Sequence, residues 1–285
     1  MAEAAWAALP RWRWPAILPW AEPLARRREA VAGNLLRLGE ADPAAVDLVF
    51  ASYGRYWAES LRLPRLSRGE IVAGVRREGW HHLDDALAGG KGAIAALPHL
   101  GGWDWGGAYL AASGYRASVV VEGLRPPELL AWFAGLRRRV GLEVITVGTG
   151  AATASLRSLA ANRVVCLLAD RVVEGVAGVD VELFGAPARL PAGPVSLALR
   201  AGAPLLPAAV YFDEATGSHL AVVRPPLRLQ RLGRFRDDVR RGTQVLASEL
   251  EALIGAAPVQ WHVLAPVWAA NPRPARASAQ PQPPA

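Results

Sequence analysis

The sequence predicts an α/β protein with a central, mostly parallel sheet flanked by helices and preceded by a helical N-terminal part. From Lys91 onward, short apolar runs typical of buried strands alternate with stretches of helical periodicity, a pattern typical of parallel strands joined by helical crossovers. Before Lys91 the apolar residues recur mostly at helical spacing. The chain has 285 residues, of which 52% are hydrophobic, which is enough for one large core.

The helical part contains three predicted helices. The first covers residues 24–38, where apolar side chains form a stripe between arginines. The second covers residues 43–62 and begins after Asp42 with a proline, a favourable N-cap and first-turn pair. The third covers residues 69–89 and ends at a pair of glycines, which readily terminate a helix.

The sheet is predicted from five apolar runs and the helices between them. The strands are expected at residues 92–97, 117–121, 143–147, 163–169 and 205–212. The helices are expected at residues 103–113, 126–140, 151–161 and 193–202. A further strand pair is predicted at 180–184 and 219–223, and a last helix over 235–255. No internal repeat or linker divides this region, so we expect a single domain over residues 24–270.

The two ends of the chain differ from this domain in composition. Residues 1–23 interleave tryptophan with arginine and proline, which interrupts any signal-peptide core and suits the headgroup layer of a bilayer. We expect a membrane-contacting arm, the alternative being an arm that folds onto the domain surface. Residues 271–285 are rich in Pro, Ala and Gln and predict a disordered tail.

No window of the sequence contains the ~20 consecutive apolar residues that a membrane-spanning helix needs.

The charge balance and the single cysteine limit the class of protein. The net charge is +7 and the pI about 10.4, with Lys91 the only lysine. Such basicity predicts a polyanionic partner or an acidic membrane surface, unless the arginines only reflect genome composition. No nucleic-acid-binding motif stands out, so we expect no nucleic-acid partner. Cys166 cannot form an internal disulfide and is predicted to be a small buried hydrophobe.

The run from Leu97 to Asp104 carries the clearest indication of chemistry. His99 and Asp104 lie five positions apart, with two glycines between them. On one continuous helix this spacing would hold the side chains about 140° apart, whereas the glycines free the backbone to turn. A helix starting near Trp103 would also aim its N-terminal amides at the site. The pair predicts a general base and its carboxylate, or a loop histidine beside a capping aspartate.

Charged residues also follow two other predicted strands. Asp170 and Arg171 directly follow one of them, and Glu122 directly follows another. Ligands of open α/β sheets bind at the carboxyl ends of the strands, so we expect these residues to line a binding crevice, with Asp170 supporting His99 or fixing an arginine. Arg137, one of three consecutive arginines, is a candidate to reach an anionic group. The alternative for each is a surface ion pair or a solvated charge.

Four further features have weaker implications. Residues 184–194 predict a Gly/Pro-rich loop along which a long apolar chain passes, or a simple surface turn. His81 and His82 are adjacent on a predicted helix, where their rings point apart, so a solvated face is favoured over a metal site. His219, in a predicted turn, and His262, beside a tryptophan, are predicted to be structural.

Five motifs in order resemble the lipid A lauroyl/myristoyl-type acyltransferase family. Within that family, the chain most resembles the actinobacterial phosphatidylinositol mannoside acyltransferases, over roughly residues 25 to 268. The segments that carry the resemblance are Tyr56-Trp57 with Leu61-Arg62-Leu63-Pro64, Leu97-Pro98-His99 with Trp103-Asp104, Ala169-Asp170-Arg171, Phe184-Gly185-Ala186-Pro187-Ala188 with Pro191-Ala192-Gly193-Pro194, and Pro258-Val259-Gln260-Trp261-His262.

The resemblance implies a glycerolipid acyltransferase-like fold and a direct transfer reaction. The acyl chain, of palmitoyl type, would pass from acyl-CoA to a mannose 6-hydroxyl of an anionic glycolipid on the inner leaflet. His99 would be the general base, Asp104 its partner carboxylate and Asp170 an assisting acid. Glu122 and Arg137 would lie near the acceptor and the thioester. No serine or cysteine neighbours His99 in the chain, so no acyl-enzyme is expected.

The resemblance implies no metal and no cofactor, with acyl-CoA as co-substrate. We expect a monomer bound peripherally, or monotopically, to the cytoplasmic face of the cell membrane. Two alternatives stay open. One is an acyltransferase that acts on another glycolipid or a lysophospholipid, and the other is a non-catalytic lipid-binding protein.

Overall fold

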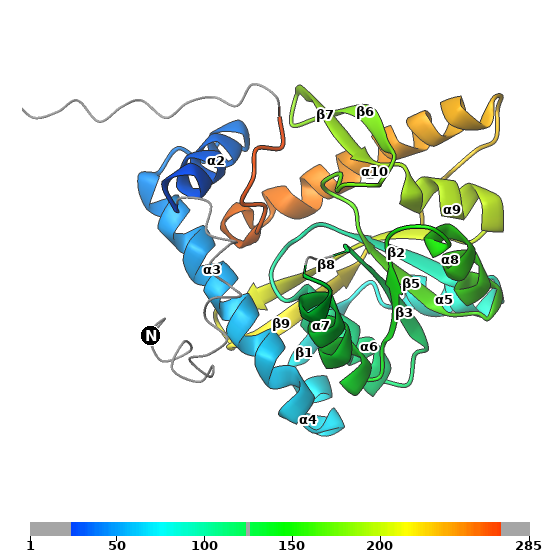
Figure 1. Ribbon diagram of the computed structural model, residues 1–285, viewed down its shortest axis with the longest axis horizontal. Helices are drawn as coiled ribbons and strands as arrows, with labels where there is room; N and C mark the ends of the chain where they lie inside the picture. Colours follow the sequence, from blue (N-terminus) through cyan, green and yellow to red (C-terminus); the bar gives the residue numbers. More distant parts are fainter. Residues whose placement is uncertain (1–23, 124–125, 269–285) are drawn as a thin grey trace, which may run out of the picture.

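The computed structural model describes residues 24–123 and 126–268 and has a seven-stranded sheet at its centre (Figure 1). Its strands are β1 (Val75–Glu78), β2 (Ala93–Leu97), β3 (Ala117–Val121), β4 (Glu143–Thr146), β5 (Val164–Leu168), β8 (Leu205–Asp213) and β9 (Ser218–Val223). Their order is β1-β9-β8-β2-β5-β3-β4, and every neighbouring pair is parallel except β8–β9. The predicted α/β fold is confirmed.

Helices cover both faces of this sheet (Figure 1). The N-terminal helices are α2 (Leu24–Arg37), α3 (Pro43–Arg62) and α4 (Arg68–Ala73). The others are α5 (His81–Ala88), α6 (Trp103–Ala112), α7 (Pro127–Arg139), α8 (Ala151–Ala160), α9 (Gly193–Ala201) and α10 (Phe235–Gly255), and short 3₁₀ turns cover Leu63–Arg65 and Pro258–Gln260. α3 has the predicted bounds, and the Asp42 carboxylate caps it by accepting the Ala44 amide at 2.9 Å.

Strand β2 shows why the central strands are apolar throughout. Ala93 and Ala95 pack in one cluster with side chains of α5 and α6, whereas Ile94 and Ala96 pack in the other with α8, α9 and α10. Both faces of the strand are therefore buried, and its sequence is a continuous apolar run. The same arrangement brings the carboxyl ends of β2, β3 and β5 to one edge.

The residues predicted as one helix over 69–89 form α4, β1 and α5 instead. α4 ends at Gly74. Gly79 has a φ of +64°, and a Cβ there would overlap the carbonyl oxygen of Val223, so only glycine fits. The prediction was wrong because β1 is a mostly exposed edge strand without apolar alternation. Its pairing with β9, far away in the chain, makes it a strand.

Two predictions for residues 178–223 were wrong, namely the pairing of two strands and a loop at 184–194. The strands predicted at 180–184 and 219–223 both exist, but they do not pair with each other. The first is β6 (Gly178–Leu183), which pairs with β7 (Ala186–Pro191) across the residues predicted as a loop, and β9 pairs with β8 and β1. Phe184 and Gly185 have φ of 49° and 67°, and positive φ at both central residues is typical of a two-residue hairpin turn.

The division of the chain into arm, domain and tail stays a prediction. The arm at 1–23 and the tail at 271–285 lie outside the described residues. In the part of the chain that the structure describes, no helix combines the length and the apolarity needed to cross a bilayer.

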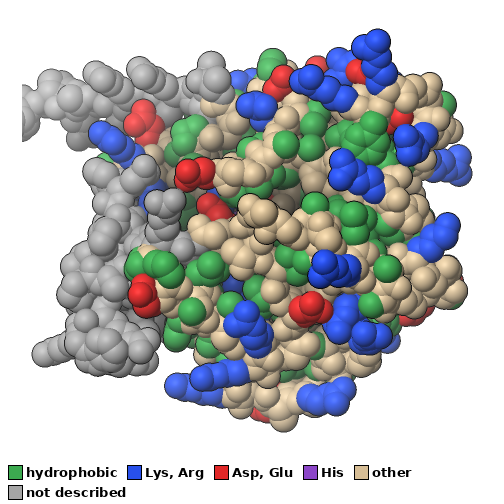
Figure 2. Space-filling model, turned by 45° about the vertical axis from the view of Figure 1, so that its right-hand side comes forward, with side chains coloured by type: hydrophobic (Ala, Val, Ile, Leu, Met, Phe, Trp, Pro, Cys, Tyr) green, Lys and Arg blue, Asp and Glu red, His purple; other side chains and the backbone are tan. Residues whose placement is uncertain are grey.

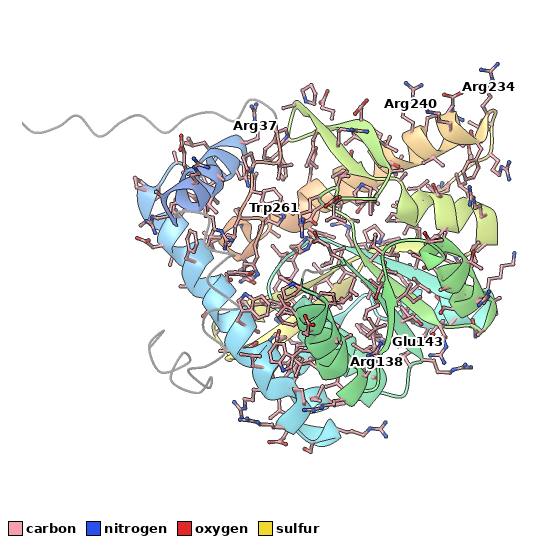
Figure 3. The ribbon with its side chains drawn as sticks, viewed as in Figure 1. Arg37, Arg138, Glu143, Arg234, Arg240 and Trp261 are labelled. Atoms are coloured by element: carbon pink, nitrogen blue, oxygen red, sulfur yellow. The ribbon has the colours of Figure 1, made fainter. Side chains whose placement is uncertain are left out.

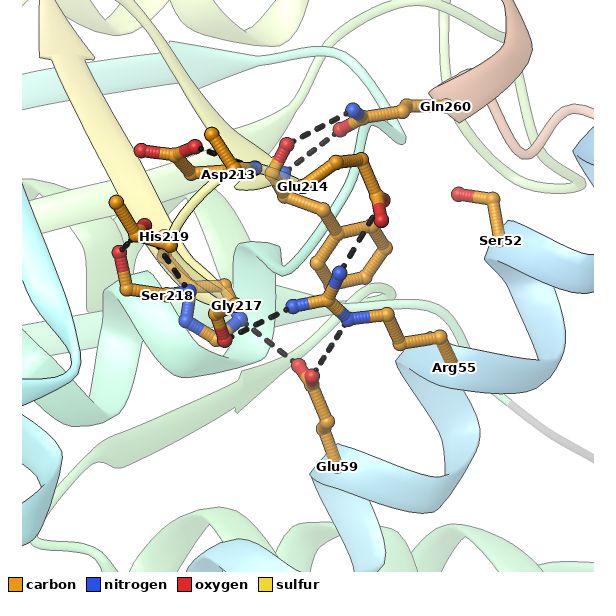
Figure 4. A network of polar contacts seen from close by, with 12 residues as sticks. Ser52, Arg55, Glu59, Asp213, Glu214, Gly217, Ser218, His219 and Gln260 are labelled. Carbon is orange, nitrogen blue, oxygen red and sulfur yellow. Dashed lines mark hydrogen bonds and ion pairs between the residues drawn. The ribbon is translucent and has the colours of Figure 1, made fainter.

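A partly buried polar network joins α3 to the β8–β9 pair (Figure 4). Glu59 accepts the ring N–H of His219 at 2.8 Å and the Arg55 Nε–H at 2.8 Å. His219 lies within β9 rather than in the predicted turn, is 2% exposed and stacks on Trp105 at 4.4 Å between ring centroids. Its structural role, by contrast, agrees with the prediction.

This network predicts how stability responds to acid. Burial would raise the pKa of Glu59, but hydrogen bonds and charges of His219 and Arg55 hold it below its usual value. The carboxylate therefore stabilises the fold above its unfolded pKa of about 4.3, and this contribution is lost as pH falls through the lower folded value. Glu59→Gln is expected to lower the free energy of unfolding at neutral pH by about 2 kcal/mol and to flatten its decline below about pH 4.5.

Chemical denaturation across pH measures both effects. Glu214→Gln is the matched control, because Glu214 also pairs with Arg55 but is 79% exposed, and exposed pairs contribute about 0–1 kcal/mol. An acid transition in Glu59→Gln as steep as in the native protein would show that the network does not titrate.

Candidate active site

Polar residues meet where β2, β3 and β5 end. His99 follows β2, Glu122 follows β3 and Asp170 follows β5. Because these strands are parallel neighbours, the three residues lie at the same edge of the sheet. This is the edge at which ligands of open α/β sheets bind.

His99 and Asp170 form a close, oriented pair. Asp170 Oδ1 lies 2.6 Å from His99 Nδ1, and Asp170 Oδ2 accepts the backbone N–H of His99 at 2.8 Å. Asp170 is completely buried, whereas the His99 side chain keeps 16% exposure. Burial would raise the pKa of Asp170, but the His99 charge and the hydrogen bonds from His99 and Trp261 hold it below its usual value. Asp170 is therefore ionised and fixes the ring, which leaves Nε2 free to act as a base.

The loop after His99 turns sharply, as the glycines predicted. Gly101 has a φ of +55°, and a Cβ there would overlap the carbonyl oxygen of Val210. The amides of Gly101 and Gly102 bond to the carbonyl oxygens of Gln260 and Val210, both at 2.9 Å. The loop between β2 and α6 is thus held against β8 and the segment after α10.

Asp104 has different partners from the predicted one, His99. Its carboxylate accepts hydrogen bonds from the Nε–H and a second N–H of the Arg137 guanidinium at 2.8 and 3.0 Å. It also accepts one from the Tyr56 hydroxyl at 2.8 Å. Among the described residues, no hydrogen bond or ion pair joins it to His99. The position beside the ring Nδ1 is occupied by Asp170, and the partly buried guanidinium of Arg137 is compensated by the Asp104 carboxylate. Asp104 therefore orients Arg137.

Glu122 and Arg171 form a third pair at the same edge. Their side chains lie 2.7 Å apart and are each more than a third exposed. This exposure makes the charged groups accessible to a polar substrate. An exposed ion pair of this kind contributes little to stability.

An apolar cavity of about 510 Å³ opens beside these groups. His99, Asp104, Glu122, Arg137 and Arg171 all line it, with Asp170 behind His99. One part runs between the sheet and α6 as far as Trp80 and Leu83, and its lining is mostly small or apolar, including Leu97, Ala95, Cys166, Val119, Gly106, Gly107 and Leu110. Cys166, predicted to be buried, is only partly buried because it faces this cavity, and the apolar surroundings raise the pKa of its thiol to about 12.

Three residues of the site were not predicted to belong to it. The Tyr56 ring stacks on Trp103 at 3.9 Å between centroids, and its hydroxyl holds Asp104. The Trp261 indole N–H donates to Asp170 at 2.7 Å. His262 donates its backbone N–H to the His99 carbonyl oxygen at 2.7 Å. Tyr56, Trp261 and His262 stand in the motifs that carry the family resemblance, but nothing in the sequence indicates which polar group each would contact.

A histidine–carboxylate pair beside an apolar cavity, at the carboxyl edge of a parallel sheet, is typical of an enzyme active site. The chain belongs to the bacterial lipid A biosynthesis acyltransferase family, whose model matches residues 38–270. This confirms the family resemblance and identifies the chain as an acyltransferase.

Similar curated proteins include the phosphatidylinositol mannoside acyltransferases of mycobacteria. Those of two Mycobacterium tuberculosis strains are each 38% identical over 253 and 256 residues, which cover 85% of this chain and 78% of each relative. The protein of Mycolicibacterium smegmatis is 36% identical over 252 residues, covering 85% of this chain and 80% of that protein.

Proposed function

We propose that this protein transfers a palmitoyl-type chain from acyl-CoA to a mannose hydroxyl of phosphatidylinositol mannosides. The observation that carries the proposal is the cavity, because its apolar part meets the His99–Asp170 pair at the edge of the sheet. The mycobacterial relatives, which are named for this acceptor, support the choice of acceptor.

In the proposed reaction, His99 Nε2 removes the proton of the acceptor hydroxyl as its oxygen attacks the thioester carbonyl. Asp170 holds the ring and stabilises the imidazolium that forms. The tetrahedral intermediate then collapses, the C–S bond breaks, and the CoA thiolate takes the proton back from His99. The products are the ester and free CoA. A thioester is already activated, so positioning and a base supply most of what the reaction needs.

The transfer is proposed to be direct, without an acyl-enzyme. Within the described part of the chain, no hydrogen bond joins His99 to a serine or cysteine. Cys166 lines the cavity, but a thiol whose pKa burial raises to about 12 stays protonated and unreactive near neutral pH. Detection of a covalently acylated protein would contradict this step.

The two ion pairs at the edge are proposed to bind the polar part of the acceptor. Arg137, held by Asp104, and Arg171, paired with Glu122, line the cavity mouth. Guanidinium groups suit a phosphate, and carboxylates suit sugar hydroxyls. The acceptor is anionic and polar, so this division of contacts fits it.

The protein is proposed to work as a monomer at the cytoplasmic membrane surface. Basic side chains are spread over much of the face drawn in Figure 2, and the net charge is +7. Such a surface is attracted to the anionic lipids of the inner leaflet.

The test is to incubate the purified protein with radiolabelled palmitoyl-CoA and a panel of acceptors. The panel contains phosphatidylinositol mannosides, other glycolipids and lysophospholipids, and the product is identified by mass spectrometry. Acylation of the mannosides alone is the expected result. A product from another acceptor would reassign the substrate, and binding of acyl-CoA without turnover would make this a lipid-binding protein.

A substitution inside the cavity tests whether the acyl chain lies there. Ala95→Leu adds apolar bulk to the part between the sheet and α6. Since each buried methylene contributes about 0.8 kcal/mol, displacing two of them should lower kcat/KM for a long-chain acyl-CoA by roughly tenfold or more, whereas a short-chain donor should react as before. An equal loss for both donors would place the chain elsewhere.

A further inference from the structure

The segment that follows α10, residues 260–262, forms backbone contacts with the loop that contains His99. Gln260 O accepts the Gly101 amide at 2.9 Å, His262 N donates to His99 O at 2.7 Å, and Trp261 forms an antiparallel bridge with Leu100. The segment thus pairs with the loop as a short strand would, although more than 150 residues separate them. Figure 3 labels Trp261 where the chain leaves α10.

The same segment is fixed on its other side. The Gln260 side-chain amide donates to Phe212 O at 3.0 Å, and its oxygen accepts the Phe212 amide at 2.7 Å. The His262 ring bonds Ser52 Oγ in α3 at 2.8 Å. The segment after α10 is therefore anchored to β8 and to α3, and it has little freedom to move relative to the sheet.

Trp261 reaches the pair directly. Its indole N–H donates to Asp170 Oδ2 at 2.7 Å, and the side chain is 3% exposed. Asp170 is completely buried and accepts three N–H groups, namely His99 Nδ1, the His99 amide and this indole. The first two belong to the residue that Asp170 must orient, so the indole is the donor that ties the carboxylate to a separate part of the fold.

We propose that Trp261 is a positioning residue of the reaction, which holds the Asp170 carboxylate in the plane that orients His99. The proposal rests on the proposed role of His99 as the general base. A carboxylate bonded to one residue alone can rotate with it, whereas a second fixed donor on Oδ2 leaves Oδ1 aimed at the ring. The indole N–H also stabilises the buried negative charge.

Trp261→Phe and Trp268→Phe form a matched pair of variants. Both tryptophans are 3% exposed and belong to the same core cluster, but the Trp268 indole donates to a backbone carbonyl, that of Leu183, at 3.0 Å. Trp261→Phe is expected to lower kcat by roughly 10- to 100-fold, the effect of losing a hydrogen bond to a charged group, with little change in KM. Trp268→Phe should lower the melting temperature by a similar amount as Trp261→Phe does, and its kcat should stay within about twofold of the native value.

The pH profile separates positioning from packing. The indole bond is one of the interactions that keep the pKa of Asp170 low, so its loss should move the acid limb of kcat/KM to higher pH. His262 does not add to this limb, because burial, with a smaller effect of His99, lowers its pKa to about 3. Trp268→Phe should leave the limb in place. Equal kinetic losses and unmoved acid limbs in both variants would overturn the proposal.

A measurement without substrate keeps the test independent of the proposed function. In the native protein with ¹⁵N-labelled indoles, the Trp261 resonance should shift as the pair takes up a proton, and the Trp268 resonance should not. This result would stand even if His99→Ala kept full activity, which would refute the proposed general-base role of His99. A Trp261 resonance that does not move with pH would refute the positioning role, whether or not Trp261→Phe folds.

Discussion

His99→Ala is expected to reduce acyl transfer by about 10³–10⁴-fold, since a positioned general base contributes up to that range. The ring is the group at the cavity mouth that can accept the hydroxyl proton, and Asp170 already holds its Nδ1 side. The variant should fold normally, because the His99 side chain is partly exposed and the backbone bonds of the loop do not depend on the ring.

The measurement is transfer from radiolabelled palmitoyl-CoA to phosphatidylinositol mannosides under saturating conditions. His82→Ala is the control, because His82 lies on α5 and is not one of the residues that line the cavity. It should keep native activity. If His99→Ala retained a tenth or more of the native rate, the general-base mechanism would fail.

Asp170→Asn is expected to lower kcat by about 10²–10³-fold. Asp170 accepts three N–H groups on two oxygens, whereas an asparagine has one accepting oxygen and places an N–H₂ against a donor. The ring then loses its orientation. Because Asp170, whose pKa the native contacts hold low, is then absent as a titrating group, the acid limb of the pH–rate profile should also change.

Asp104→Asn is the matched comparison at the other carboxylate. Asp104 bonds Arg137 and Tyr56 rather than His99, so its loss should weaken acceptor binding and raise KM while the acid limb stays in place. If instead Asp104→Asn moved the acid limb and Asp170→Asn did not, the orienting carboxylate would be Asp104, as the motif spacing first indicated.

Elements with a strong local pattern were predicted within one or two residues, and those without one were missed. The buried strands are apolar on both faces and α3 has its cap and its periodic stripe, so both are recognisable locally. β1 reads Val-Arg-Arg-Glu and is a strand through its partner β9. β7 contains two prolines and is a strand because a two-residue turn folds it onto β6. The pairing of β1 is decided by residues far away in the chain, and that of β7 by a turn that its own prolines do not indicate.

The same limit applies to the site. His99 could be selected because it follows a buried strand and precedes two glycines, and Asp170 because it follows a second strand. Which carboxylate meets the ring could not be read from spacing. β2 and β5 are neighbours in the sheet, so their following residues converge, whereas Asp104 lies on α6 within reach of the Arg137 guanidinium from α7.

The sequence by itself determined the fold class, the acyltransferase family and the edge of the sheet that carries the chemistry, because these depend on local periodicity and on residues close in the chain. The tertiary structure decided the partners: Asp170 with His99, Arg137 with Asp104, and Trp261 behind Asp170. Partners are set by strand order and helix placement, which bring together groups separated by up to 91 residues and which no local pattern encodes.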